Sequence, residues 1–184
     1  MGRLVNSTYI TLDGVIEDPQ DWPTLGSFSD RGNQIQTELL LASDAMVMGR
    51  RTYEGFAPVW TSRSGDPYSD RINSMPKYVA SRTLQDPSWD NTTVIEGDLA
   101  AHVARLKDET AGHVIQYGFG AVTHALLRAG LLDELRLWLH PFLVGRGGVD
   151  ALLYHDSLSA TFELDDVTTL DSGIAVLTFT KAPS

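Results

Sequence analysis

The sequence predicts an α/β fold in which a mostly parallel sheet is covered by helices on both faces. Up to about residue 140, short runs of β-branched and apolar residues alternate with segments whose apolar residues have helical spacing. This alternation is typical of parallel strands joined by helices. The tail from Phe162 to Thr180 contains two strand-like runs separated by Asp171-Ser172-Gly173. That pattern predicts an antiparallel hairpin added to the edge of the sheet.

The individual elements follow from local composition. Strand predictions rest on β-branched and aromatic runs, helix predictions on apolar spacing, and loop predictions on clusters of glycine and proline. The first half is predicted to contain a strand at 3–12, a turn at Asp13-Gly14, a loop at 17–33, a helix at 33–43, a strand at 45–48, a loop at 62–75 and a strand at 77–80. The second half is predicted to contain a short strand at 94–97, a helix at 99–107, a strand at 113–117, a helix at 121–129, a strand at 135–141 and a glycine-rich loop at 145–148.

Length and composition limit the possible functions. The 184 residues suit one domain over 1–184, and the 42% hydrophobic content is ordinary for a globular protein. The net charge of −10 argues against a nucleic-acid partner. The absence of cysteine excludes disulfides, thiolate zinc sites and a cysteine nucleophile, and the five histidines lack metal-ligand spacing. Because no signal peptide or membrane-length apolar segment occurs, we expect a cytoplasmic protein with no membrane partner.

Residues 47–54 are the most informative stretch. An apolar run ends there in Gly49, Arg50, Arg51 and Thr52. Glycine allows close approach of a ligand, the guanidinium groups suit phosphate, and Thr52 is expected to cap a following helix. A strand that ends in glycine and cations at a helix start is suited to a phosphorylated ligand. The alternative is an ordinary strand-to-helix turn with two solvated arginines.

Two further segments carry similar chemistry. Ser81-Arg82-Thr83 follows a predicted strand and places two hydroxyls beside a guanidinium. Gly118-Phe119-Gly120-Ala121-Val122 is a glycine turn that opens a predicted helix. It lacks the third glycine of the dinucleotide fingerprint and lies late in the chain, which disfavours a Rossmann domain. Together the three segments predict a dinucleotide site on a different α/β sheet.

Four blocks of the sequence, 7–14, 47–54, 77–84 and 130–148, resemble the dihydrofolate-reductase-like superfamily. The resemblance is closer to the C-terminal reductase domain of bifunctional riboflavin-biosynthesis enzymes, and it covers nearly the whole chain. It implies a central sheet of about eight strands with flanking helices, and NADPH as the hydride donor. The chain lacks the cysteine ligands of the deaminase domain that accompanies the riboflavin enzyme, so we expect a stand-alone reductase-like protein.

The resemblance also assigns residues. Arg82 would receive the 2′-phosphate of NADPH, and the loop after Asp13-Gly14 would cover the nicotinamide near Glu17. The implied cofactor-binding residues are Gly49, Arg50, Arg51, Thr52, Ser81, Arg82, Thr83, Tyr117, Gly118, Gly120, Ala121 and Val122.

The sequence defines the catalytic and substrate-binding residues less clearly than the cofactor-binding residues. Asp13, Glu17 and Asn33 are the catalytic candidates, although Asp13 is also explained as the turn-forming residue of Asp-Gly. Folate reductases carry a carboxylate at the position that matches Asn33, so dihydrofolate reduction is disfavoured. An amide there could instead bind the edge of a pyrimidine or flavin-like ring. Trp22 is a candidate substrate contact or a core anchor.

The expected function is therefore an NADPH-dependent reductase of a small heteroaromatic substrate, resembling 5-amino-6-(5-phosphoribosylamino)uracil reductase. One alternative is a catalytically silent nucleotide-binding or regulatory module on the same fold, motivated by the missing carboxylate and by Phe119. Another is a homodimeric scaffold in which the apolar strand at Leu135–Leu139 pairs with a second copy.

Overall fold

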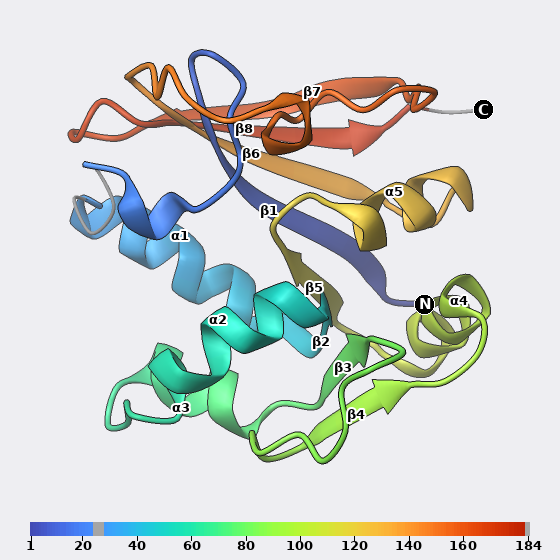
Figure 1. Cartoon of the computed structure of the whole chain (residues 1–184). Helices are drawn as coiled ribbons and strands as arrows, with labels where there is room; N and C mark the ends of the chain where they lie inside the picture. The colour runs from blue at the N-terminus through green and yellow to red at the C-terminus, as the bar shows by residue number, and fades with distance from the viewer. Residues whose placement is uncertain (24–27, 183–184) are drawn as a thin grey trace.

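The computed structural model describes residues 1–23 and 28–182. Eight strands form one sheet in this part of the chain, and five α-helices flank it (Figure 1). The strands are β1 (Arg3–Thr11), β2 (Ser43–Gly49), β3 (Lys77–Ala80), β4 (Thr92–Ile95), β5 (His113–Tyr117), β6 (Glu134–His140), β7 (Phe162–Thr169) and β8 (Ala175–Lys181). The helices are α1 (Asp30–Leu41), α2 (Arg50–Trp60), α3 (Pro67–Ser74), α4 (Leu99–Glu109) and α5 (Ala121–Arg128), with short 3-10 helices η1 (Pro19–Asp21) and η2 (Val149–Ala151).

The strand order is β4-β3-β2-β5-β1-β6-β8-β7. The first six strands of this order are parallel, whereas β8 is antiparallel to β6 and β7 is antiparallel to β8. The predicted fold class is therefore confirmed, including the C-terminal hairpin. The alternative in which the strand at 135–139 pairs with a second copy is wrong, because β1 and β8 already occupy both edges of β6.

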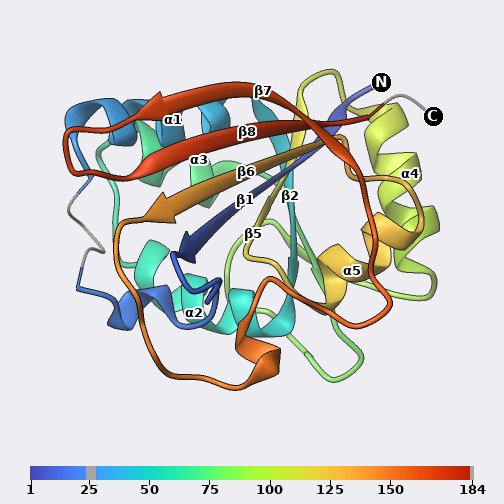
Figure 2. The same ribbon diagram turned by 90° about the horizontal axis from the view of Figure 1, so that it is seen from above.

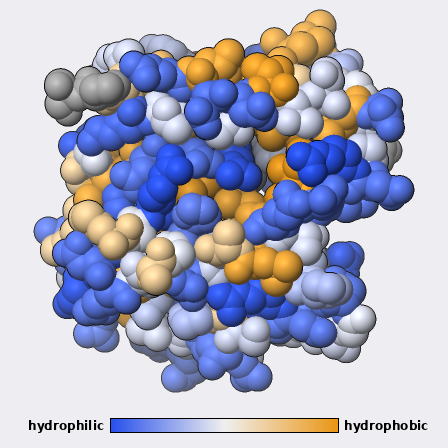
Figure 3. Space-filling model, turned by 180° about the vertical axis from the view of Figure 1, so that it is seen from behind, coloured by the Kyte–Doolittle hydropathy of each residue, from blue (hydrophilic) through white to orange (hydrophobic). Residues whose placement is uncertain are grey.

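Helices cover both faces of the sheet, and strand β2 shows how the sequence specifies this. Met46 and Met48 pack on one face against α1, α2 and α3, whereas Ala45 and Val47 pack on the other against α4 and α5. Because both faces of β2 are buried, its residues 45–48 form a continuous apolar run. Figures 1 and 2 show α4 and α5 together at one side of the molecule. The surface seen from behind is mainly hydrophilic, with separate groups of hydrophobic side chains (Figure 3).

Two predicted loops need correction. Residues 62–75, predicted as a loop, contain helix α3, which begins with Pro67. The Asp66 carboxylate caps α3 by accepting from the N–H groups of Tyr68 and Ser69, an arrangement that the sequence Asp-Pro allowed. The predicted loop at 17–33 contains η1, and α1 begins within it at Asp30. Residues 24–27 of that loop lie outside the described residues.

Candidate active site

A crevice is expected at the carboxyl ends of β2 and β5. These strands are neighbours, but β2 leads into α2 on one face and β5 leads into α5 on the other. The two turns lie side by side. A Cβ added to Gly49 would stand 3.3 Å from Val122, and one added to Gly118 would stand 3.9 Å from the Thr52 hydroxyl. Two of the three segments predicted to hold the cofactor therefore meet here.

The helices that start at this crevice differ from the other three. The side chains of Ser29, Asp66 and Asp98 accept backbone hydrogen bonds at the starts of α1, α3 and α4. Helices α2 and α5 follow Gly49 and Gly120 instead and have no side-chain cap. The prediction that Thr52 caps α2 is wrong, since the helix already begins at Arg50. First-turn N–H groups on both sides of the crevice are thus available to an anion.

The third predicted segment, Ser81-Arg82-Thr83, is joined to the site by Arg50. The Arg50 guanidinium donates to Thr83 Oγ1 at 2.5 Å and to Glu54 at 2.6 Å, which ties α2 to the turn after β3. In that turn, Ser81 Oγ accepts from the N–H groups of Thr83 and Leu84. Arg82 is exposed, and across the described residues it forms no ion pair. Its charge is therefore available to a ligand phosphate.

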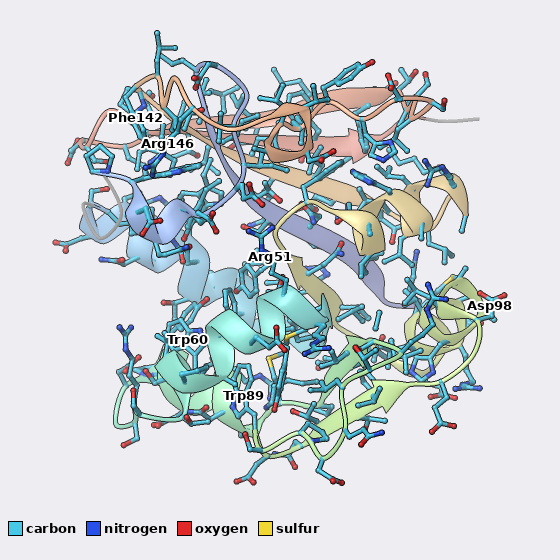
Figure 4. All side chains as sticks on the ribbon, in the orientation of Figure 1. Arg51, Trp60, Trp89, Asp98, Phe142 and Arg146 are labelled. Carbon is cyan, nitrogen blue, oxygen red and sulfur yellow. The ribbon has the colours of Figure 1, made fainter. Side chains whose placement is uncertain are left out.

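Arg51 points to a different part of the site (Figure 4). It forms ion pairs with Glu17 and with Asp18, the latter at 3.4 Å, and so connects the start of α2 to the loop after β1. Glu17, a catalytic candidate, is thereby held by a cation. Its catalytic role stays a prediction.

Asp13 holds two loops together. Its carboxylate accepts hydrogen bonds from the Thr11 hydroxyl at 2.5 Å and from the N–H groups of Val144 and Gly145 at 3.2 and 2.8 Å. The turn predicted at Asp13-Gly14 is also present, since the Gly14 N–H donates to the Thr11 carbonyl. The bond from Thr11, followed by the backbone bonds, lowers the pKa of Asp13 to about 2.

We expect Asp13→Ala to speed hydrogen exchange at the amides of Val144 and Gly145 by about tenfold or more, because each loses its acceptor. In the wild type, these bonds should be complete above pH 4 and lost as the pH falls towards 2, since the folded-state pKa lies below the unfolded value. Exchange measured by NMR tests this, with Asp171→Ala in the β7–β8 turn as the control. Unchanged exchange in Asp13→Ala would contradict the assigned role.

A group of hydroxyls lies on the α1 side of the sheet. Gln36 donates its amide N–H to Tyr9 Oη at 2.9 Å, and the hydroxyls of Tyr68 and Tyr117 are 2.9 Å apart. Burial raises the pKa of Tyr68 to about 12 and that of Tyr9 still further, so these phenols stay protonated donors. In the described residues, the Tyr9 hydroxyl hydrogen and the Gln36 carbonyl oxygen have no partner. They offer an adjacent donor and acceptor to a polar ring edge.

The structure places two predicted substrate residues differently. Asn33 is exposed, and the amide that α1 turns towards the sheet is Gln36. Trp22 is only 5% exposed and packs edge-on against His140 and Phe142. This packing is that of a core anchor, the alternative role given for Trp22. Contact of Asn33 or Trp22 with a substrate stays a prediction. Gln36 and the tyrosines were missed as a group because only the tertiary fold brings them together.

Phe119 is half-buried and does not lie between the two helix starts. Its ring packs with the α4 and α5 core and contacts His124 edge-on at 5.5 Å. It also lines a cavity of about 310 Å³ beside Gly120 and Ala121. The bulky ring in the glycine turn therefore shapes a neighbouring cavity.

In the described part of the chain, no helix is long and apolar enough to cross a membrane.

Comparisons with known proteins find relatives of similar sequence and similar fold. The uncharacterized protein YyaP of Bacillus subtilis strain 168 is 29% identical over 158 residues, which cover 79% of this chain and 78% of YyaP. A protein of Shewanella sp. PV-4 has a similar fold, with a TM-score of 0.76 at 22% identity over 98% of this chain and 99% of that one. A pyrimidine reductase-like protein of Corynebacterium diphtheriae gives 0.65 at 14% identity over 100% and 93%.

A longer enzyme also shares the fold. The diaminohydroxyphosphoribosylaminopyrimidine deaminase/5-amino-6-(5-phosphoribosylamino)uracil reductase of Thermotoga maritima gives a TM-score of 0.66 at 17% identity, over 98% of this chain and 57% of the enzyme. The RibD C-terminal domain family matches residues 3–176, which is nearly the whole sequence. The chain therefore belongs to the RibD C-terminal domain family.

Proposed function

We propose that this protein is an NADPH-dependent reductase that acts on a small heteroaromatic substrate, a pyrimidine of the riboflavin-biosynthesis type. Family membership and the names of the Corynebacterium and Thermotoga proteins support the reaction class. The observation that carries the proposal is the pair of uncapped, glycine-led helix starts that meet at the β2–β5 crevice. This arrangement fits a pyrophosphate, which needs close backbone approach and several N–H donors.

The residues of the site would have different roles. Gly49, Gly118 and the first turns of α2 and α5 would hold the pyrophosphate, while Arg82 would bind the 2′-phosphate. When bound, the cofactor supplies the hydride. Tyr9 and Gln36 would orient the ring of the substrate through its polar edge, and the loops joined by Asp13 would exclude water.

The geometry disfavours dihydrofolate reduction. The residues of α1 that are buried or turned towards the sheet include Gly32, Ile35, Gln36 and Leu39, and none is a carboxylate. A neutral amide offers both a donor and an acceptor, whereas a folate reductase uses a carboxylate at this helix. The silent-module alternative shares the cofactor site, so turnover of NADPH with a pyrimidine acceptor separates it from the proposal.

Calorimetry with NADPH and NADH tests the cofactor assignment. We expect the wild type to prefer NADPH, and Arg82→Ala to weaken NADPH binding about tenfold to 100-fold, because a charge-assisted contact to phosphate is lost. Binding of NADH should be unchanged in this variant. Arg105→Ala, which removes an exposed arginine of α4, is the matched control. No binding of either cofactor to the wild type at millimolar concentration would refute the proposed function.

A further inference from the structure

Strand β1 holds the glycine turn after β5 by both polar groups of Gly118. The Gly118 N–H donates to the Ser7 carbonyl at 3.2 Å, and the Gly118 carbonyl accepts from the side-chain amide of Asn6 at 2.7 Å. The hydroxyl of Thr123, in the first turn of α5, donates to the same carbonyl at 3.4 Å. These contacts fix the orientation of the peptide group between Gly118 and Phe119.

Asn6 is a buried polar residue in a central strand, where asparagine is disfavoured and needs hydrogen-bond partners. Its Nδ2 also donates to Gln116 Oε1 at 3.2 Å, and its Oδ1 accepts from the Thr8 hydroxyl at 2.7 Å. A backbone carbonyl can only accept, so Nδ2 must face Gly118. The side chain is thus held in one orientation, with its strongest contact on the glycine turn.

The position of Asn6 determines where the Phe119 N–H points. Strands β1 and β2 lie on opposite sides of β5 (Figure 1). In a trans peptide the carbonyl and the N–H point in opposite directions, and the described residues contain no cis peptide. Because the Gly118 carbonyl points towards β1, the Phe119 N–H points towards β2, where Gly49 precedes α2.

The Phe119 N–H is therefore directed into the β2–β5 crevice. Within the described residues this N–H donates no hydrogen bond. The Phe119 ring packs into the core beneath α4 and α5 and leaves the crevice side of its own backbone uncovered. A donor that is fixed in advance binds an anion without the cost of reorganisation.

We propose that Asn6 is a positioning residue of the cofactor site. By holding the Gly118 carbonyl, Asn6 directs the Phe119 N–H into the crevice as a donor to the cofactor pyrophosphate. The inference deepens the proposed function and rests on it. Asn6 acts through the peptide group and does not itself touch the cofactor.

Replacement of Asn6 by leucine tests the proposal. Leucine fills a similar volume but has no donor for the Gly118 carbonyl, so the peptide group is no longer held. We expect Asn6→Leu to weaken the binding of NADPH and of NADH about tenfold each, because both carry the pyrophosphate. Calorimetry measures both affinities. The pattern differs from that of Arg82→Ala, which affects NADPH alone.

Ser43→Ala is the matched control. Ser43 is also fully buried, and its hydroxyl donates to the Leu39 carbonyl at 2.7 Å, but it lies at the end of β2 opposite Gly49. This variant also loses a buried hydrogen bond, and it should keep the wild-type affinity for both cofactors. If Ser43→Ala lost as much affinity as Asn6→Leu, the role of Asn6 would be one of general stability and the inference would be overturned.

An NMR measurement on the wild type gives a readout that does not depend on whether a variant folds. The amide proton resonance of Phe119 should shift on addition of NADPH and of NADH, and this shift should be lost in Asn6→Leu. A Phe119 resonance unmoved by saturating NADPH, or wild-type affinity in Asn6→Leu, would overturn the inference while leaving the cofactor site intact. If the wild type bound neither cofactor, the proposed function would fail and this inference with it.

Discussion

Replacement of Lys77 by methionine is expected to lower the free energy of unfolding by about 3 kcal/mol. Lys77 is fully buried at the start of β3, and its ammonium donates to the carbonyls of Ile72, Asn73 and Met75 at 2.8–3.1 Å. It also lies 4.6 Å from the ring centroid of Trp89. Methionine fills a similar volume but leaves the carbonyls at the end of α3 without a donor. Chemical denaturation followed by tryptophan fluorescence measures the loss.

Lys181→Met provides the matched control. Lys181 is exposed and donates to a single carbonyl, that of Gly130 at 2.9 Å, so its replacement should cost less than about 0.5 kcal/mol. If the two variants were equally stable, the three buried hydrogen bonds of Lys77 would not support α3 as described.

The pH dependence of stability provides a second check on Lys77. Burial lowers the pKa of Lys77 to about 8, although the negative charge of Asp90 acts in the opposite direction and raises it. Between pH 8 and about 10.5 the unfolded state then binds more protons than the folded state, so this lysine makes stability rise with pH. That rise should be absent from Lys77→Met. A variant with the same pH profile as the wild type would contradict this assignment.

Much of the fold could be predicted because local and tertiary requirements agree. The strand at 77–80 and the helix start at 121 coincide with the structure, since apolar periodicity and a glycine turn mark them. The composition of residues 62–75 does not predict helix α3, because Gly65 and Pro67 are typical of loops. Its position is determined instead by the Asp66 cap and by burial of Ile72 against the sheet. Here a local capping signal was stronger than the polar composition.

The candidate site could be predicted only in part. The glycine turns after β2 and β5 are local features, and their meeting follows from the strand order, which places β2 beside β5. The partners of Arg51 and the contact between His124 and His155 depend on how residues 12–23 and the long segment 141–161 cross the sheet edge. No periodicity in the sequence encodes those crossings, because loops are held by specific hydrogen bonds such as those of Asp13.

We expect Gly118→Ala to weaken NADPH binding about tenfold or more, because the added methyl group would narrow the crevice between the two helix starts. Gly118 has φ +76°, and its Cβ would stand 3.9 Å from the Thr52 hydroxyl. A dinucleotide that approaches the backbone at this point would meet the new atom, and overpacking of this kind costs about 1–3 kcal/mol. Calorimetry with NADPH measures the effect.

Gly97→Ala separates this steric effect from backbone strain. Gly97 has φ +80°, almost the same as Gly118, but no atom lies within 4 Å of the Cβ that it would gain. Both variants should therefore lose a similar amount of stability, roughly 1–2 kcal/mol, because alanine is disfavoured in the left-handed region. Only Gly118→Ala should lose NADPH affinity. Equal NADPH affinity in the two variants would place the pyrophosphate elsewhere, since the narrower crevice would then have no effect on binding.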